Sequence, residues 1–295
     1  MTHVRHPTPD PRLDAPESDG GEDRAWYLYG IIHAVRHLPE EAAGVEIPAV
    51  DPVTVGEMPL QRVTLGDLAA VVRAVSRSDF TDEALQARLG DPATLEEMVR
   101  EHNEVITALH AQQAILPAKF GAVYARLEDL QRALEERAPA LHAGLDHIEG
   151  CDEWALHVYV DRAAFERHVA AGDPSLRRLR DDLAQASPGR AYFLQRKLAN
   201  DLAGATDAAM GELATSVYED LRRLSVDAHV TSASGPAVAG QGAIEVLRAA
   251  FLVSRADTEA FLSAADSLAA DREGVRIEHS GPWPPYSFAA EGERG

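Results

Sequence analysis

Two histidines near the start of the chain have a spacing that suits metal binding. His33 and His37 are four residues apart, and Glu40 and Glu41 follow them. Histidines at i and i+4 of an α-helix project from one face and can share a metal ion. Here they follow a strand-like run and enter a proline-containing stretch, so the helix that they need is not indicated. A metal site is therefore the less favoured interpretation, and we expect no metal ion or other cofactor.

His102 and Lys119 are the two other side chains that could take part in catalysis. His102 falls among the apolar residues of a predicted helix. It could be a buried general base, or a core histidine with a satisfied hydrogen bond. No partnered nucleophile accompanies it, which favours the core histidine. Lys119 stands beside an apolar strand-like run, where a structural ion pair is favoured over a site lysine. An enzyme or a ligand-binding sensor would require a closed polar pocket around both side chains.

The remaining motifs are incomplete. Cys151 is the only cysteine, which excludes an intramolecular disulfide, and its acidic neighbours disfavour a reactive thiolate. Gly235, Gly240 and Gly242 resemble part of a phosphate-binding loop. The pattern G-x-G-x-x-G fails because the next required position is Glu245, so a hairpin loop is favoured. With no complete catalytic motif, we expect a protein that is not an enzyme.

The composition disfavours two classes of partner. The 295 residues carry 28 basic and 48 acidic side chains, a net charge of −20. A chain this acidic is repelled by phosphate backbones and by anionic lipid surfaces. No stretch approaches about 18 consecutive apolar residues, and the polar N-terminus has no apolar run typical of a signal peptide. We therefore expect neither nucleic-acid binding nor membrane binding, and a cytoplasmic location.

The residues up to about Gly150 predict a mixed α+β domain. An aromatic and β-branched run at its start is typical of a strand buried on both faces. Asp91 and Pro92 suit the N-cap and the first position of a helix, whose apolar stripe includes Val99. Pro139 is expected to separate two further helices. The expected elements are strands over 26–32, 61–65, 68–75 and 120–124, and helices over 82–89, from 91 onward, over 126–137 and over 139–149.

The residues from 151 predict a second domain. A stripe that ends with Leu213, Val217, Leu221 and Leu224 predicts one long helix. Such a helix spans roughly 50 Å, so part of it is expected to pair with the preceding helix as a coiled-coil-like hairpin. The element order matches a modified ferredoxin-like domain with an enlarged helical hairpin. The expected elements are strands over 153–160, 226–232, 246–254 and 275–280, and helices over 162–172, 174–186, 191–224 and 257–270.

The C-terminal segment differs in kind from the rest. Three prolines and two aromatic residues, Trp283 and Tyr286, fall within six positions. Proline favours an extended backbone, and such a backbone with two aromatic rings can pack across a groove. Because it directly follows a predicted core strand, a strap over the chain's own N-terminal domain is favoured over a contact with a partner. The expected organisation is a disordered segment 1–23, an α+β domain 24–150, a modified ferredoxin-like domain 151–280 and a C-terminal extension 281–295.

Five segments, in the same order along the chain, resemble the gas vesicle protein F/L family (GvpF/GvpL). They are 26–31, 115–124, 148–154, 191–192 and 280–288. The first opens the first predicted strand, and the second contains the pattern Leu-Pro-x-Lys-Phe-Gly-x-Val. The last of these is the most specific. The residues that carry the resemblance are Tyr29, Gly30, Pro117, Lys119, Phe120, Gly121, Gly150, Glu153, Trp154, Tyr192, Gly281, Pro282, Trp283, Pro284, Pro285 and Tyr286.

The resemblance implies an accessory or minor structural protein of gas vesicles. Such proteins are thought to bind the main shell protein GvpA and other accessory gas vesicle proteins, and to assist vesicle assembly. The resemblance also implies a modified ferredoxin fold in the second domain, and it brings no catalytic, cofactor or metal residues. The alternative is a ferredoxin-like ligand-binding sensor or small-molecule enzyme with a pocket near His102 and Lys119, since a fold does not fix a function.

Overall fold

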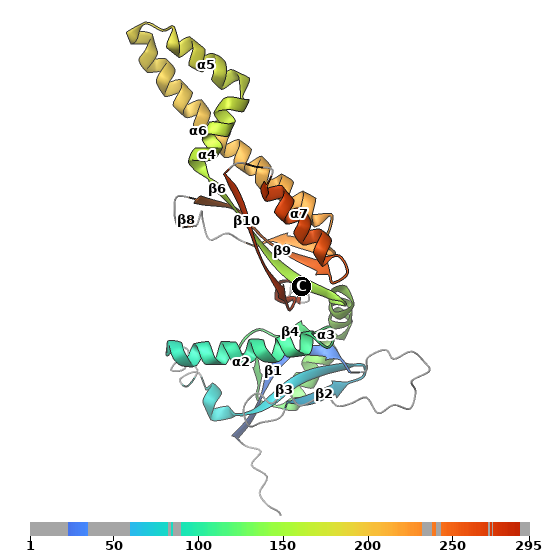
Figure 1. Ribbon diagram of the computed structural model, residues 1–295. Coiled ribbons are helices and arrows are strands. Elements are labelled where there is room, and N and C mark those ends of the chain that lie inside the picture. Colours follow the sequence, from blue (N-terminus) through green and yellow to red (C-terminus); the bar gives the residue numbers. More distant parts are fainter. Residues whose placement is uncertain are drawn as a thin grey trace, which may run out of the picture.

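The computed structural model contains two five-stranded antiparallel sheets and, among its described residues, seven α-helices (Figure 1). The predictions for 1–22, 35–59, 82–89, 232–242 and 290–295 fall outside the described residues, apart from residues 84 and 238–239. His37, Glu40 and Glu41 of the predicted metal site, and Gly235, Gly240 and Gly242 of the predicted loop, are therefore also outside the described residues. Among the described helices, none is both long and apolar enough to cross a bilayer. The structure describes residues 23–34, 60–81, 84, 90–231, 238–239, 243–270, 272 and 274–289.

The first sheet is built around its longest strand, which is buried from Ala25 to Ile32. The predicted strand with two buried faces is therefore confirmed. The predicted tight turn before Leu68 is also present, with Gly66 at φ 59°. The sheet order is β2-β3-β1-β4, and β5 also pairs with β1. The strands are β1 (Arg24–His33), β2 (Gln61–Leu65), β3 (Leu68–Ser76), β4 (Leu116–Pro117) and β5 (Val123–Tyr124), and a short 3-10 helix, η3 (Arg77–Phe80), follows β3.

Two helices, α2 (Pro92–His110) and α3 (Leu127–Ile148), pack against the first sheet. The side chain of Asp91 caps α2 by accepting a hydrogen bond from the backbone N–H of Thr94. The residues of α2 that are buried begin only at His102, so Val99, predicted on the apolar stripe, is 37% exposed.

The prediction that Pro139 divides two helices is wrong, because α3 runs through it. Pro139 itself is exposed, while Leu134 and Leu141 on either side of it are buried. Their burial holds one continuous helix on the sheet despite the missing N–H. The predicted strand over 120–124 is also shorter than expected, because Gly121, at φ 83°, is part of a turn.

The second sheet has the strand order β10-β6-β9-β7, and β8 also pairs with β9. Side chains alternate along β6, where Trp154, Leu156, Val158 and Val160 enter one core as predicted. This core also receives residues of α4, α6 and α7, which therefore cover that face of the sheet. The strands are β6 (Cys151–Asp161), β7 (Asp227–Val230), β8 (Val238–Ala239), β9 (Ala243–Ser254) and β10 (Val275–Trp283).

A helical hairpin extends away from this sheet (Figure 1). Its longest helix, α6, has 35 residues and therefore a length of about 50 Å. Only its second half enters the core, from Thr206 to Leu221, and the first half packs on α5. Leu224, predicted on the stripe, lies beyond the helix end and is 39% exposed. The helices of this half are α4 (Arg162–Gly172), α5 (Pro174–Ala184), α6 (Pro188–Arg222) and α7 (Thr258–Ala270).

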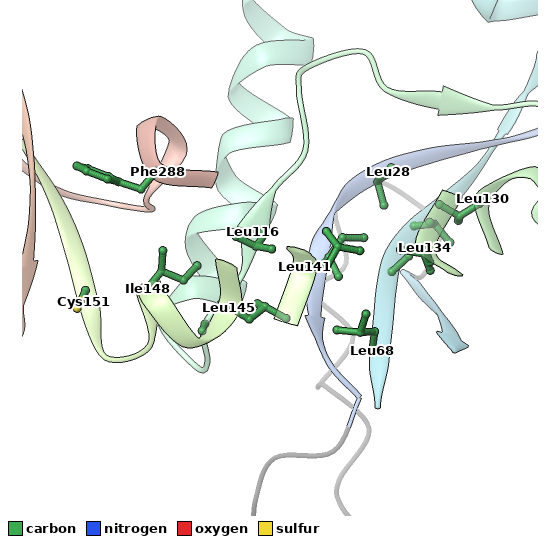
Figure 2. Close-up of a cluster of buried hydrophobic side chains, with 14 of the residues drawn as sticks. Leu28, Leu68, Leu116, Leu130, Leu134, Leu141, Leu145, Ile148, Cys151 and Phe288 are labelled. Atoms are coloured by element: carbon green, nitrogen blue, oxygen red, sulfur yellow. The ribbon is translucent and has the colours of Figure 1, made fainter. Parts of the chain in front are cut away.

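The C-terminal segment returns to the junction between the two sheets. β10 continues through a cis Gly281–Pro282 bond, and a short helix, α8 (Tyr286–Ala289), follows. Phe288 of α8 is 3% exposed and belongs to the same cluster as Ile148 of α3 and Cys151 of β6. Figure 2 shows these side chains with the leucines of α3 and the first sheet. One continuous apolar cluster therefore joins the first sheet, the C-terminal segment and the start of the second sheet.

Candidate functional site

His102 lies in a hydrogen-bonded cluster between α2 and β1. The Tyr27 hydroxyl is 2.9 Å from His102 Nδ1 and accepts a hydrogen bond of 3.2 Å from the backbone N–H of Gly121. The direction of the Tyr27–His102 bond depends on the imidazole tautomer, and His102 Nε2 is buried without a hydrogen-bond partner among the described residues. Burial lowers the pKa of His102, and the nearby backbone of Ala118 opposes this only in part. A neutral, buried imidazole results, which is the arrangement of a core histidine.

A cavity of about 450 Å³ with both polar and apolar walls opens beside this cluster. Its walls include Tyr27 and Tyr29, and the Tyr29 hydroxyl donates a hydrogen bond of 3.2 Å to Glu101, which also pairs with Arg73. Burial raises the pKa of Tyr29 well above its ordinary value. Lys119 lies outside this cavity, and it lines a separate one of about 300 Å³. The structure therefore does not bring His102 and Lys119 into one pocket.

His33 has partners other than those of the predicted metal pair. Its ring stacks on that of His142 with centroids 5.8 Å apart, and its Nε2 is 3.7 Å from Asp146. His142 in turn lies 3.0 Å from Asp67. Across the described residues, no group of three or more potential ligands is placed to hold a metal ion.

The C-terminal segment is held by hydrogen bonds to both halves of the molecule. Glu153 of β6, 8% exposed, accepts hydrogen bonds from the backbone N–H and the hydroxyl of Ser287, at 2.7 and 2.6 Å. Burial raises the pKa of Glu153, and the bonds from Ser287 oppose the shift. The Tyr286 hydroxyl donates to Asn103 of α2 at 2.9 Å, and burial raises the pKa of Tyr286 to about 12. The segment thus contacts β6 of the second sheet and α2 of the first half.

All but one of the predicted family-signature residues lie in the two sheets, at their junction or in the C-terminal segment. A Cβ on Gly30 would lie 2.7 Å from the Leu116 carbonyl oxygen. Gly281 has φ 151°, and a Cβ there would lie 2.9 Å from the Glu153 carbonyl oxygen, so a larger residue fits neither position. Tyr192 is the exception, since it lies on the distant hairpin. The others are Tyr29 and Gly30 in β1, Pro117 in β4, Lys119, Phe120 and Gly121 in the following turn, Gly150 before β6, Glu153 and Trp154 in β6, and Gly281, Pro282, Trp283, Pro284, Pro285 and Tyr286.

One polar cluster between the two halves was not predicted. His110 at the end of α2 and Asp152 of β6 lie 2.7 Å apart, and Arg255 donates to Asp152 at 3.0 Å and to the His110 carbonyl at 3.0 Å. Burial would raise the pKa of Asp152, but the hydrogen bonds from His110 and Arg255 outweigh it and lower the pKa. The three residues are far apart in sequence, and no local pattern marks them.

The exposed large apolar side chains of the described residues form two groups. The first is at β7, the terminal strand of the second sheet, and the residues just before it, where Leu224, Val226 and Val230 are 39%, 52% and 57% exposed. The second is on the helical hairpin, where Tyr192 and Phe193 are 63% and 71% exposed. The two others, Val99 and Trp283, stand singly. Clustered exposed apolar side chains mark protein interaction surfaces more often than single ones do.

The chain matches the family model described as "Gas vesicle synthesis protein GvpL/GvpF" over residues 25–290. It belongs to the GvpL/GvpF family. It is 30% identical to gas vesicle protein L of Streptomyces sp. (strain CB03234), over 92% of this chain and 95% of that protein. It is also 25% identical to gas vesicle protein L1 of Halobacterium salinarum, over 99% of both chains. The family resemblance seen in the sequence is confirmed.

Solved structures are similar to this fold. The crystal structure of GvpF from Anabaena sp. PCC7120 has a TM-score of 0.61 at 17% identity, and it covers 90% of this chain and 98% of that one. GvpF from Microcystis aeruginosa has a TM-score of 0.55 at 14% identity with the same coverage. The mixed α/β architecture with antiparallel sheets is thus that of GvpF, and membership of the family supports a role connected with gas vesicles.

Proposed function

We propose that this GvpL/GvpF chain is a non-enzymatic accessory or minor structural protein that binds the shell protein GvpA and other gas vesicle proteins in the cytoplasm and assists vesicle assembly. The observation that carries the proposal is the apolar edge of the second sheet, Leu224, Val226 and Val230. The net charge of −20 favours protein partners over nucleic acids and anionic membranes, and it keeps a complex with an apolar subunit in solution.

The edge strand β7 suits strand addition. Among the described residues, the backbone of β7 is paired on one side, with β9, and its other side has no partner strand. Edge strands are usually protected by charges, prolines or bulges, because an open edge pairs with other chains. Val226, directly before β7, and Val230, its last residue, are instead more than half exposed. A partner segment that adds a strand here gains main-chain hydrogen bonds and apolar contacts together.

We also propose that residues 151–280 form a modified ferredoxin-like domain, preceded by a domain over 24–150 and followed by an extension over 281–295. The strand order β10-β6-β9-β7 supports this, because in chain order it reads fourth, first, third, second, with all pairs antiparallel. The three helices α4, α5 and α6 stand where that fold has its first helix. The signature glycines and the tail residues have structural roles in this arrangement.

Co-purification tests the function. The full chain and a tagged GvpA are expressed together, and the amount of chain recovered with GvpA is measured. The variants Val226→Lys and Val230→Lys place charges on the edge and are expected to lower recovery at least about tenfold, since a desolvated unpaired charge opposes strand addition. Val99→Lys places the same charge on α2, where Val99 is 37% exposed, and is the control, with recovery unchanged. Absence of the wild-type chain from the purified complex contradicts the function, and undiminished recovery of both edge variants contradicts the edge.

A further inference from the structure

The outer part of the helical hairpin has a charge opposite to that of the whole chain. Residues 174–198, which comprise α5 and the start of α6, contain six basic and two acidic residues, a net charge of +4, in a chain whose net charge is −20. We call these residues the outer hairpin. Of its basic side chains, only Lys197 lies at ion-pair distance from a described carboxylate, 2.7 Å from Asp201. The exposed basic residues are Arg177, Arg178, Arg180, Arg190, Arg196 and Lys197.

Two aromatic rings accompany this charge. Tyr192 and Phe193 are 63% and 71% exposed, and their ring centroids are 5.6 Å apart in a perpendicular arrangement. Removing both rings from water stabilises a complex, and aromatic residues and arginine are the residue types that contribute most energy at protein interfaces. An aromatic pair among exposed arginines that form no ion pair with the described carboxylates therefore suits a contact with an acidic protein surface that carries some apolar area.

The chain itself has such a surface on α2, in the other half of the molecule (Figure 1). The segment Asp91–Glu104, which includes the first turns of α2, contains five acidic residues and one basic residue, a net charge of −4. Glu96, Glu97 and Glu104 on it are exposed, and Val99 is the 37% exposed apolar residue among them. Because the outer hairpin extends away from the half that contains α2, the two do not meet within one molecule (Figure 1).

We propose that the outer hairpin docks on α2 of a second copy of this chain. The arginines then face Glu96, Glu97 and Glu104, and the aromatic pair covers Val99. At physiological ionic strength charges are screened beyond about 8 Å, so the repulsion between two acidic molecules is weak at long range while pairs in contact remain attractive. The self-contact uses neither β7 nor the C-terminal segment, so it goes beyond the proposed binding of GvpA.

Sedimentation velocity on the full chain tests this contact. At about 0.15 M salt the average mass is expected to rise with protein concentration, and at about 1 M salt the chain is expected to stay monomeric. The hairpin variant Arg178→Glu/Arg180→Glu/Arg190→Glu reverses three charges, and it is expected to weaken self-association at least about tenfold.

A second variant and a mixture identify the partner surface. The α2 variant Glu96→Arg/Glu97→Arg/Glu104→Arg is expected to be monomeric alone as well. A mixture of the two variants restores complexes, because the native hairpin of the α2 variant faces the native α2 of the hairpin variant, and the two reversed surfaces are complementary as well.

The matched control is Arg222→Glu/Arg223→Glu, which reverses exposed arginines at the far end of α6 and is expected to leave association unchanged. The inference is overturned if the wild-type chain is monomeric at every concentration and salt, if the hairpin variant associates like the wild type, or if the mixture does not recover. The GvpA co-purification separates the two proposals. A hairpin variant that loses GvpA while the wild-type chain shows no self-association would assign the outer hairpin to GvpA instead.

Discussion

The substitution Phe288→Ala tests whether the C-terminal segment stabilises the whole fold. Phe288 is 3% exposed and packs in the cluster that joins both halves (Figure 2). Replacing a buried phenylalanine by alanine costs about 3–5 kcal/mol through lost burial and the cavity that remains. α8 has only four residues and can detach, which avoids a cavity. We therefore expect the lower end of that range, a loss of about 3 kcal/mol in the free energy of unfolding.

Trp283→Ala is the matched control in the same segment. Trp283 is the more conspicuous residue in the sequence, yet its side chain is 49% exposed, and its indole N–H donates only to Ser280 at 3.4 Å. With about half of the burial and no cavity, we expect a loss of about 1 kcal/mol. Urea unfolding of both variants, with stability taken from linear extrapolation, gives the comparison. Equal losses, or a larger loss for Trp283→Ala, would refute the assignment of Phe288 as the anchor.

A double-mutant cycle locates the partner of Phe288. Its ring centroid is 4.8 Å from that of His229 on β7. Aromatic pairs at this separation contribute about 0.5–1.5 kcal/mol beyond area burial. The cycle of Phe288→Ala with His229→Ala should show coupling in that range. Additive losses would mean that Phe288 is held by the leucines of the cluster alone.

Three further changes should alter stability, each measurable by urea unfolding. Glu153→Ala leaves both Ser287 donors without an acceptor and should cost about 2 kcal/mol; no loss would exclude this anchor. His102 is neutral in the fold because burial lowers its pKa, so its contribution persists above the unfolded pKa of about 6.5 and is lost as pH falls below it. Stability should therefore fall between pH 7.5 and 5.5, and less so in His102→Gln; identical pH profiles would contradict this. Pro139→Ala restores a helix N–H and should stabilise by about 1–3 kcal/mol, whereas a loss would mean that Pro139 fits its site.

Elements governed by local pattern could be predicted from the sequence. The alternation along β6 fixes which side chains face the core, because successive residues of a strand point to opposite faces. Asp91 and Pro92 mark the start of α2, because the cap and the fixed proline φ act within one turn. The long apolar run of β1 likewise indicates a strand that is covered on both faces.

Features that depend on tertiary contacts could not be predicted in this way. The propensity of Pro139 to end a helix is local, but the leucines that keep α3 on the sheet act through the fold. Val99 fits the helical stripe of α2, yet the buried residues of this helix begin only at His102. The cluster of His110, Asp152 and Arg255 joins positions more than 40 residues apart. No pattern of spacing indicates such contacts, because they arise only when the two sheets come together.

The position of Phe288 connects the C-terminal segment with the proposed binding edge. Its ring lies against His229 of β7, whereas Val230 of the same strand and Val226 directly before it are exposed. A strand held on one face by packing and on one side by β9 is already ordered, so an added strand loses less conformational entropy when it pairs. Phe288→Ala should therefore lower GvpA recovery as well as stability, while Trp283→Ala should leave recovery unchanged. If Phe288→Ala destabilises the fold and recovery remains at the wild-type level, the tail serves stability alone and the edge is ordered by β9.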